Sequence, residues 1–331
     1  MSQPALQAQQ LSFFGKIPSR GDFVKGSYNP QLFKILDSWL SQAMELLAED
    51  ARWKSIYDTA TPMRFVCLGS RSKLVIAGCV LPSRDAAQRR YPFVTAMPLE
   101  VERPQDFMAG APLLLDDYWR RSSAAAQAIL ASPDGIGDLK QLEEISAPIA
   151  TVFQGTDAHL SYQEFVRSHS LLRLEQMLNG DGRHVSVRRI ILALGMLLQP
   201  VMASGVSHLE KGLTLPLPRE PHMQGLVATL WLDFISRFLG RADFELAVFL
   251  CHIDGRPRLV IGFSGLAPKS LQGVIHPQAY LDQNIEIDDA EWVEDGIHNN
   301  YAMYKLVSYL DQPQLPLDII ITAFREVFIG E

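Results

Sequence analysis

Two short segments of the sequence gather the residue types that bind charged groups. The first segment holds Lys16, Ser19, Arg20 and Asp22, and the second holds Ser83, Arg84, Asp85, Arg89 and Arg90. An arginine beside hydroxyl groups can bind phosphate, and a guanidinium binds a carboxylate through two parallel hydrogen bonds. Three alternatives are therefore open: the cations pair with the two aspartates and brace the segments, the segments contact a partner protein, or they bind a small ligand.

Both segments need neighbouring elements that hold them in place. The first contains three residues that bend a chain: Gly15, Pro18 and Gly21. They predict a defined loop between the buried aromatic residues Phe13 and Phe14 on one side and Phe23 on the other. The second segment also follows a buried, strand-like run. We therefore predict that the two loops meet in space, although about sixty residues separate Asp22 from Asp85.

The surrounding pattern mixes strands and helices. Asn29-Pro30 is typical of a helix start, and apolar residues follow it at helical spacing. Short turns between apolar runs predict an antiparallel meander over residues 64–68, 74–81 and 91–99. Asp254-Gly255 predicts a hairpin that joins residues 246–253 to 258–263. Further helices are expected at residues 113–131, 165–178, 187–203, 226–238, 300–310 and 316–328. The fold class is therefore α/β (mixed α+β), with a largely antiparallel or mixed sheet flanked by helices.

Composition excludes several classes of function. The 331 residues are 47% hydrophobic and 20% charged, as in a packed globular protein, and the net charge is −7. A negative chain has no general affinity for nucleic acid or for anionic membranes. The longest apolar run, residues 190–203, is too short for membrane insertion, and residues 1–10 do not resemble a signal peptide. We expect a cytoplasmic protein whose three cysteines (Cys67, Cys79 and Cys251) are reduced and mainly buried.

A search for catalytic or metal-binding patterns finds none that is specific. Ser264 lacks the glycine spacing of a nucleophile elbow, and no histidine lies near Ser83 and Asp85 in the sequence. The eight histidines and three cysteines form no zinc-type pairs, and no phosphate-binding glycine loop is present. We therefore expect no catalytic site, no metal and no cofactor.

One other segment is strongly charged. Residues 282–295 contain seven acidic residues and no basic one. Such a segment is a solvated loop or a contact for a basic partner. Trp292 lies inside it and is the one tryptophan that we expect to be exposed, because the other four fall in apolar surroundings.

Three blocks of the sequence stand out when they are taken together and in order. The first block is FFGKIPSRGDFVKG at residues 13–26, followed by a helix with Asp37-Ser38-Trp39-Leu40. The second comprises Arg52-Trp53, Tyr57 and Met63-Arg64-Phe65-Val66, and the third runs from Gly78 through Asp85 to Arg89-Arg90-Tyr91-Pro92-Phe93. These blocks resemble the TagF family of accessory proteins of bacterial type VI secretion, and a looser likeness continues to about residue 275. Gln88 departs from the family, which usually has glycine before the Arg–aromatic–Pro turn.

The resemblance implies a protein that is not an enzyme. It implies a post-translational negative regulator of type VI secretion that binds a forkhead-associated scaffold protein, and we place the binding surface on the nine charged and hydroxyl residues named above. Two alternatives stay open: a structural or assembly subunit of the secretion apparatus, and a hydrolase or phosphate-binding enzyme built on Ser83 and Asp85.

The expected organisation has three parts. Residues 1–11 are a flexible N-terminus. Residues 12–275 are the TagF-like α/β domain, which can divide into subdomains at 12–205 and 206–275. Residues 276–331 are an added C-terminal helical element, with the acidic loop and two helices.

Overall fold

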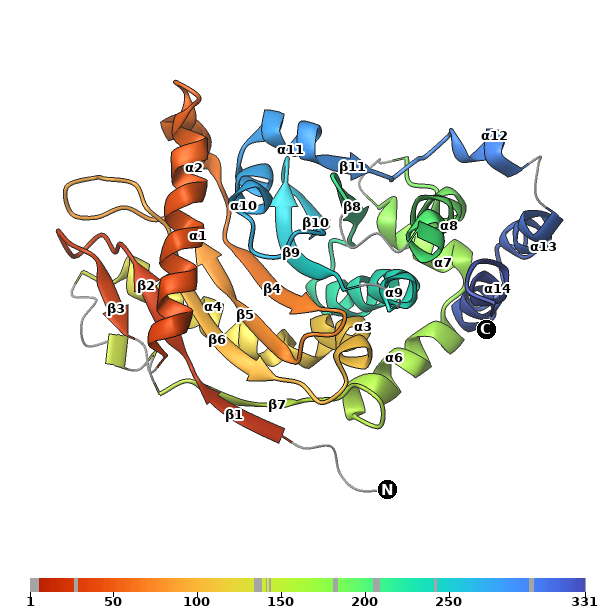
Figure 1. Ribbon diagram of the computed structural model, residues 1–331, viewed down its shortest axis with the longest axis horizontal. Coiled ribbons are helices and arrows are strands. Elements are labelled where there is room, and N and C mark those ends of the chain that lie inside the picture. Colours follow the sequence, from red (N-terminus) through yellow and green to blue (C-terminus); the bar gives the residue numbers. More distant parts are fainter. Residues whose placement is uncertain are drawn as a thin grey trace.

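The computed structural model describes residues 6–26, 29–133, 139–140, 142, 144–180, 184–204, 209–240, 243–297 and 301–330. Within these residues the chain forms a nine-stranded sheet with helices on both faces (Figure 1). The mixed α/β class predicted from the sequence is confirmed.

The sheet has the strand order β11-β8-β10-β9-β4-β5-β6-β2-β3. Its strands are β2 (Ser12–Gly15), β3 (Val24–Gly26), β4 (Met63–Gly69), β5 (Leu74–Leu81), β6 (Phe93–Glu100), β8 (Gly212–Pro216), β9 (Glu245–Ile253), β10 (Arg256–Gly262) and β11 (Asn284–Glu286). Neighbouring strands are antiparallel, except that β11 runs parallel to β8. The predicted meander is confirmed as β4, β5 and β6.

Local signals position two further elements as the sequence predicts. The Asn29 side chain accepts hydrogen bonds from the backbone N–H groups of Gln31 and Leu32, both at 3.0 Å, and so caps α1 (Pro30–Ala48). Asp254 and Gly255 have φ angles of 50° and 72° at the tip of the β9–β10 hairpin. A two-residue turn with both φ angles positive matches the twist of the flanking strands.

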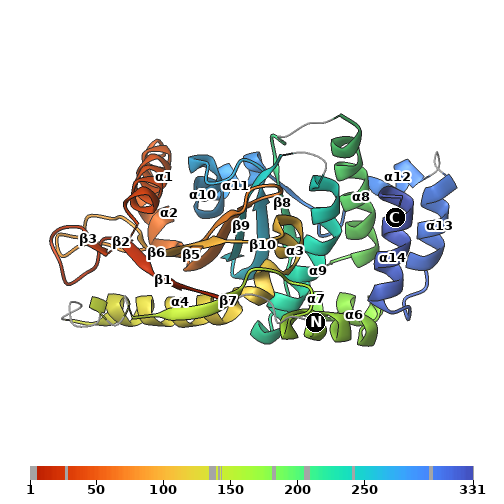
Figure 2. The ribbon, with the colours of Figure 1, turned by 60° about the horizontal axis from the view of Figure 1, so that its bottom comes forward.

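Helices cover the two faces of the sheet, as the edge-on view shows (Figure 2). One face carries α1, α2 (Trp53–Thr59), α10 (Pro268–Ile275) and α11 (Pro277–Gln283). The other face packs against α3 (Pro104–Leu114) and α4 (Asp116–Ala131). The same apolar core extends from there through α6 (Asp157–Ser168), α7 (Leu171–Leu178), α8 (Val187–Ser204), α9 (Pro221–Leu239), α13 (Tyr301–Leu310) and α14 (Leu317–Phe328). The short helix α12 (Val293–Ile297) lies near α8. Each face thus has its own apolar core.

Two of the predicted helices are each broken. The helix expected at 113–131 begins only at Asp116, because α3 ends at Leu114 and the chain turns at Leu115. The helix expected at 165–178 is α6 followed by α7, and Ser170 caps α7 by accepting the N–H of Arg173 at 3.3 Å. Apolar residues continue at helical spacing through both breaks, so periodicity alone does not locate them.

The chain start also differs from the expectation. Leu6–Gln10, part of the predicted flexible N-terminus, is strand β1 and pairs antiparallel with β7 (Ser146–Ala150), while residues 1–5 lie outside the described ones. The partner strand is distant in sequence, so no local pattern reveals this pairing. Strands from both predicted subdomains belong to one sheet, since β4 pairs with β9. The domain boundaries themselves stay a prediction.

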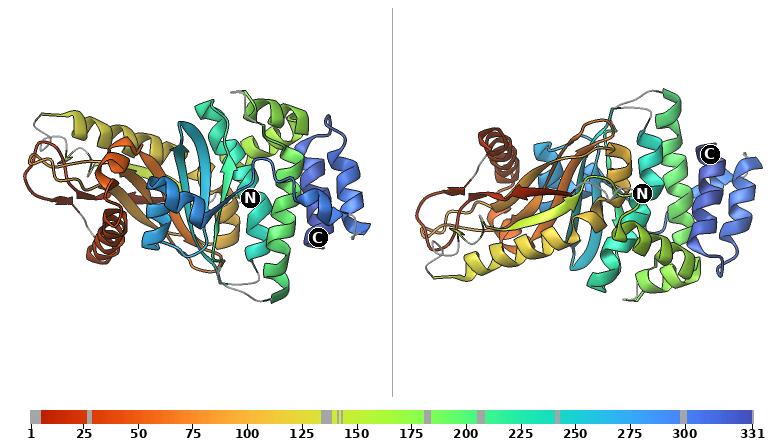
Figure 3. Two further views of the ribbon diagram at one scale, coloured as in Figure 1. Left: turned by 90° about the horizontal axis from the view of Figure 1, so that it is seen from above. Right: turned by 90° about the horizontal axis from the view of Figure 1, so that it is seen from below.

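The two predicted C-terminal helices are confirmed as α13 and α14, whose bounds lie within one residue of those predicted. Asn300 lies outside the described residues. Phe324 of α14 packs edge-on against Phe234 of α9, with ring centroids 4.7 Å apart. A Cβ atom on Gly195 of α8 would lie 2.1 Å from the Phe328 ring. The C-terminal helices therefore belong to the main apolar core. Figure 3 shows them beside α8 from above and from below.

The cysteines occupy apolar surroundings as expected. Cys79 and Cys251 are buried and Cys67 is partly exposed, and all three are free thiols. Burial raises the pKa of Cys79 to about 11 and those of Cys67 and Cys251 to about 12, so the thiols stay protonated at neutral pH. In the described part of the chain, no helix combines the length and the apolar character needed to cross a membrane.

Candidate functional site

The sheet register brings the two charged segments to the same end of the sheet. Leu81, the last residue of β5, pairs with Phe93, and Phe93 pairs with Gly15, the last residue of β2. The loop after β2 (residues 16–23) and the loop before β6 (residues 82–92) therefore leave the sheet side by side; we call them the charged loop pair. Gly15 has φ +139°, and a Cβ atom there would lie 2.1 Å from the Pro92 carbonyl oxygen. Only glycine allows this close approach.

Asp85 is the hub of the charged loop pair. Its side chain is fully buried, and it accepts from Lys16 Nζ at 3.0 Å and from Arg89 Nε at 2.7 Å. Its other carboxylate oxygen accepts the backbone N–H groups of Ala87 and Arg89 at 3.0 and 2.9 Å. Burial acts to raise the pKa of Asp85, but these hydrogen bonds and the Lys16 charge hold it far below its ordinary value. Asp85 is therefore ionised at neutral pH.

Backbone contacts also join the two loops. Ser83 Oγ donates to the Lys16 carbonyl oxygen at 2.7 Å, and the Ala86 N–H donates to the Arg20 carbonyl oxygen at 2.7 Å. The Arg89 guanidinium donates to the Gly21 carbonyl oxygen. The prediction that the two loops meet is confirmed.

The one departure from the family pattern has a structural consequence. Gln88 has φ +62°, in the left-handed region that glycine tolerates best. Its N–H donates to the Asp85 carbonyl oxygen at 2.9 Å and closes the turn that carries Arg89. The loop thus keeps the turn that a glycine would favour and holds a glutamine in it.

The nine predicted site residues divide into locked and uncommitted side chains. Lys16, Ser83 and Asp85 are buried, and Arg90 pairs with Asp58 through Nε at 2.8 Å. Among the described residues, Asp22 accepts only its neighbour's N–H, from Phe23 at 2.8 Å, so bracing by Asp22 is not what the structure shows. Ser19 is partly buried. The guanidinium groups of Arg20 and Arg84 make no hydrogen bond or close ion pair with the described residues, although the Arg84 charge adds to Arg90 in lowering the pKa of Asp58.

Phe23 differs from the two aromatic residues at the start of its loop. Phe13 and Phe14 are buried, whereas Phe23 is 44% exposed. Its ring stacks on Phe14 at 5.3 Å and meets Tyr91 edge-on at 4.9 Å, and Lys16 Nζ lies 5.1 Å from its centroid. An aromatic side chain that is both exposed and held on several sides is a typical interface anchor. The sequence gives the ring but not its exposure.

The acidic segment, residues 282–295, combines exposed carboxylates, such as Asp282 and Asp295, with carboxylates that pair with arginines of this chain. Glu286 and Asp288 pair with Arg258, whose side chain is only 4% exposed. Asp289 and Glu294 pair with Arg189 at 2.5 and 3.1 Å. The basic partner is thus this chain itself, through arginines distant in sequence. Trp292 is 43% exposed, as predicted.

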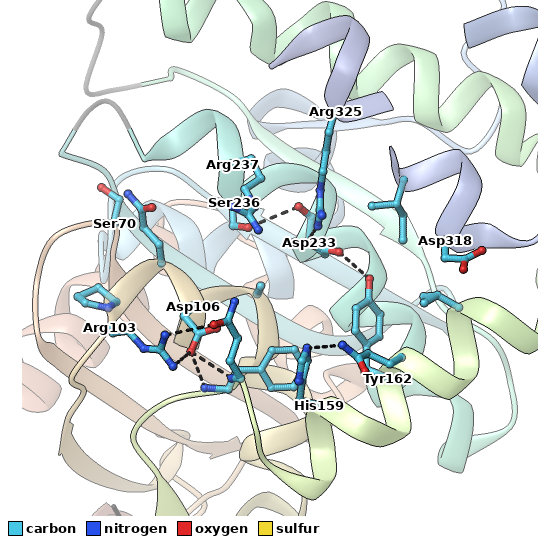
Figure 4. Close-up of a pocket in the computed structure, with 18 of the residues that line it drawn as sticks. Ser70, Arg103, Asp106, His159, Tyr162, Asp233, Ser236, Arg237, Asp318 and Arg325 are labelled. Carbon is cyan, nitrogen blue, oxygen red and sulfur yellow. Dashed lines mark hydrogen bonds and ion pairs between the residues drawn. The ribbon is translucent and has the colours of Figure 1, made fainter. Parts of the chain in front are cut away.

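A cavity of about 780 Å³ lies away from both charged regions, and sequence reasoning missed it. Its walls come from the turn after β4, from α3, α6 and α9, and from α14 (Figure 4). Asp233 is buried there, accepting from Tyr162 Oη at 2.8 Å and from Arg325 at 2.6 Å. The available signal was a single aspartate within the apolar stripe of residues 226–238.

Comparison with known proteins gives a match to a family model and a similarity to a solved structure. Residues 12–145 match the family model of the TagF N-terminal domain, described as type VI secretion system-associated. The crystal structure of PA0076 from Pseudomonas aeruginosa PAO1 is similar to this chain with 24% sequence identity and a TM-score of 0.33. That similarity covers 40% of this chain and 60% of the Pseudomonas chain. No curated protein matches.

Proposed function

We propose that this chain, whose residues 12–145 match the family model of the type VI secretion-associated TagF N-terminal domain, is a negative regulator of type VI secretion. In this proposal it acts after translation, in the cytoplasm and without catalysis, by binding a forkhead-associated scaffold protein and denying it to the secretion machine. The observation that carries the proposal is the division of the charged loop pair into locked and uncommitted cations.

The locked part makes the surface rigid. Asp85 ties Lys16 and Arg89 together, and three backbone carbonyl oxygens are held by groups from the facing loop. A surface that is already ordered loses little conformational entropy when it binds a partner. The charged loop pair is thus built to present side chains in fixed positions.

The uncommitted part gives the surface its charge. Arg20 and Arg84 lie on the two joined loops, and neither guanidinium makes a hydrogen bond or close ion pair with the described residues. Phe23 supplies an exposed ring on the same loop as Arg20. Arginine and aromatic side chains dominate the binding energy of protein interfaces, and charge complementarity sets orientation and association rate. We expect the scaffold to present an acidic surface with an apolar pocket.

The test uses the double variant Arg20→Ala/Arg84→Ala in the full chain. Calorimetry with the forkhead-associated scaffold of the parent bacterium should show affinity weakened by at least about tenfold, because two charge-assisted contacts are lost. Secretion in the parent bacterium should rise. The thermal melt should stay within about 2 °C of wild type, since neither side chain braces the fold.

The matched control is Arg256→Ala, which removes an exposed arginine beside the turn of the β9–β10 hairpin, outside the charged loop pair. It should leave affinity unchanged. Arg89 is left out of the test because its loss also frees Asp85, which would mix binding with stability. Unchanged scaffold affinity in the double variant, with the control behaving the same, rejects this surface.

A further inference from the structure

The cavity between α3, α6, α9 and α14 has the size and the opening of a small-molecule site. Its volume of about 780 Å³ falls within the usual range for ligand pockets. It also spans the boundary of the family match: Arg71 and Arg103 come from residues 12–145, whereas Arg167, Arg237 and Arg325 come from later helices. Figure 4 shows Arg103 on one wall of the cavity and Arg237 and Arg325 on another.

The carboxylates in the walls already have partners. Asp106 accepts the backbone N–H groups of Phe153 and Gln154 at 2.7 and 3.2 Å. Asp233 accepts from Tyr162 and Arg325, as described above. Glu102 accepts from Thr151 Oγ1 at 3.3 Å, and Asp318 accepts the Ile319 N–H at 2.8 Å. Asp106, Asp233 and Glu102 are therefore engaged by groups from elsewhere in the chain, whereas Asp318 contacts only the backbone of its neighbour among the described residues.

Two of the arginines retain free donors. Arg325 uses one terminal nitrogen for Asp233, and its other N–H groups have no partner among the described residues, although its side chain is only 28% exposed. Arg167 lines the same cavity from α6, and its guanidinium likewise makes no hydrogen bond or ion pair within the described ranges. A guanidinium has five N–H donors in a fixed fork that matches carboxylate and phosphate oxygens.

The buried contacts around Asp233 fix where Arg325 points. Tyr162 is almost fully buried, and its hydroxyl donates to one carboxylate oxygen of Asp233 while Arg325 donates to the other. Because burial raises the pKa of Tyr162 well above its ordinary value, the phenol stays a neutral donor. Tyr162 and Asp233 are therefore positioning residues that aim Arg325 into the cavity (Figure 4).

From this arrangement we propose that the cavity binds a small organic anion through a phosphate or carboxylate group, with Arg167 and Arg325 as its principal contacts. Phe153, Val166 and Ile321 line the same cavity and supply apolar contact for the organic part. The site is separate from the charged loop pair, so it goes beyond scaffold binding. Both principal contacts lie after the residues that match the family model, while Arg103 from residues 12–145 lines the same cavity.

The experiment is calorimetry of the full chain with ATP, free of divalent cations, and in a second arm with citrate, at ionic strength fixed by NaCl. At least one of the two anions should bind with a dissociation constant below about 1 mM and should raise the melting temperature, because a ligand that binds only the folded state stabilises it. Binding of ATP alone identifies phosphate as the recognised group, and binding of citrate alone identifies carboxylate.

Variants locate the binding. Arg167→Ala should weaken it by about tenfold, as expected for the loss of a charge-assisted contact, while the matched control Arg173→Ala, an exposed arginine on the next helix, should change it less than about twofold. Arg325→Lys keeps a cation beside Asp233 but loses the fork, and should also weaken binding about tenfold. The proposal is overturned if neither anion binds at 10 mM, or if Arg167→Ala and Arg325→Lys bind as tightly as Arg173→Ala.

Discussion

The charged loop pair and the acidic segment lie towards opposite ends of the long axis of the molecule (Figure 1). They differ in how many of their charged side chains form ion pairs within the chain. In the loop pair, one carboxylate, Asp85, holds two cations and leaves Arg20 and Arg84 uncommitted. In the acidic segment, three arginines (Arg188, Arg189 and Arg258) take up Glu286, Asp288, Asp289 and Glu294. The first region therefore has arginines that form no ion pair with the described residues and can contact another molecule, whereas most carboxylates of the second are paired within the fold.

From the sequence alone, both charged segments appear equally able to bind another molecule. Only the positions of the opposite charges, which the fold brings in from distant residues, distinguish a region of internal ion pairs from a binding surface.

The largest effect should come from Arg258, the buried cation of the acidic segment. Arg258→Ala leaves Glu286 and Asp288 without their cation at a site where the arginine is only 4% exposed. We expect the free energy of unfolding to fall by about 3 kcal/mol. Urea denaturation measures it. The exposed neighbour on the same strand, Arg256, provides the control, and Arg256→Ala should stay within about 0.5 kcal/mol of wild type. Equal effects for the two variants would contradict an internal role for the acidic segment.

A smaller effect is expected from Asp85, the hub of the loop pair. Asp85→Asn removes the charge beside buried Lys16 but keeps acceptors for the backbone N–H groups. The melting temperature at pH 7 should fall by about 5 °C. Asp22→Asn, which changes an exposed carboxylate on the facing loop, should not shift it.

The same variant has a pH signature. Because the pKa of Asp85 is depressed in the folded state, the unfolded state binds more protons at acid pH, so the stability that this group supplies is present above about pH 4 and is lost as the pH falls below it. The difference in melting temperature between wild type and Asp85→Asn should therefore shrink at pH 3. A difference that stays constant from pH 7 to pH 3 would show that the charge of Asp85 does not brace the loops.

The smallest effect should come from the turn that closes the second loop. Gln88→Gly replaces a side chain held at φ +62° with the residue that adopts this conformation most readily. We expect a gain of a few tenths of a kcal/mol, up to about 1 kcal/mol, since relief of the backbone strain exceeds the added freedom of the unfolded chain. Ala87→Gly, one residue earlier, has no such strain to relieve and should destabilise slightly. If both variants destabilise equally, Gln88 is not strained.

Sequence reasoning succeeded where the deciding information was local. The Asn29 cap, the Asp254-Gly255 hairpin and the meander each depend on neighbouring residues, and each is present in the structure. The meeting of the charged loops also followed from local signals, because both loops leave strands that flank β6. Sequence reasoning could not identify pairs of residues that are far apart in the chain. The β1–β7 pair, the arginines of the acidic segment and the Tyr162–Asp233–Arg325 contact all join residues far apart in the chain.

Exposure was a second quantity that the pattern could not supply. Phe23 and Phe14 have the same residue type and similar neighbours, yet one ring is 44% exposed and the other is 5% exposed. The difference arises because Phe14 points into the core under α1, while Phe23 lies on top of the Phe14 ring. Sequence alone therefore named the loop of the proposed interface but not its aromatic anchor.

Both outermost strands of the nine-stranded sheet, β3 and β11, are only three residues long. An open sheet edge invites another chain to add a strand by backbone hydrogen bonding, and very short edge strands offer little template for this. Self-association by edge pairing is accordingly disfavoured at either side of the sheet. At these two edges a partner finds little backbone to pair with, so contact there must be made through side chains.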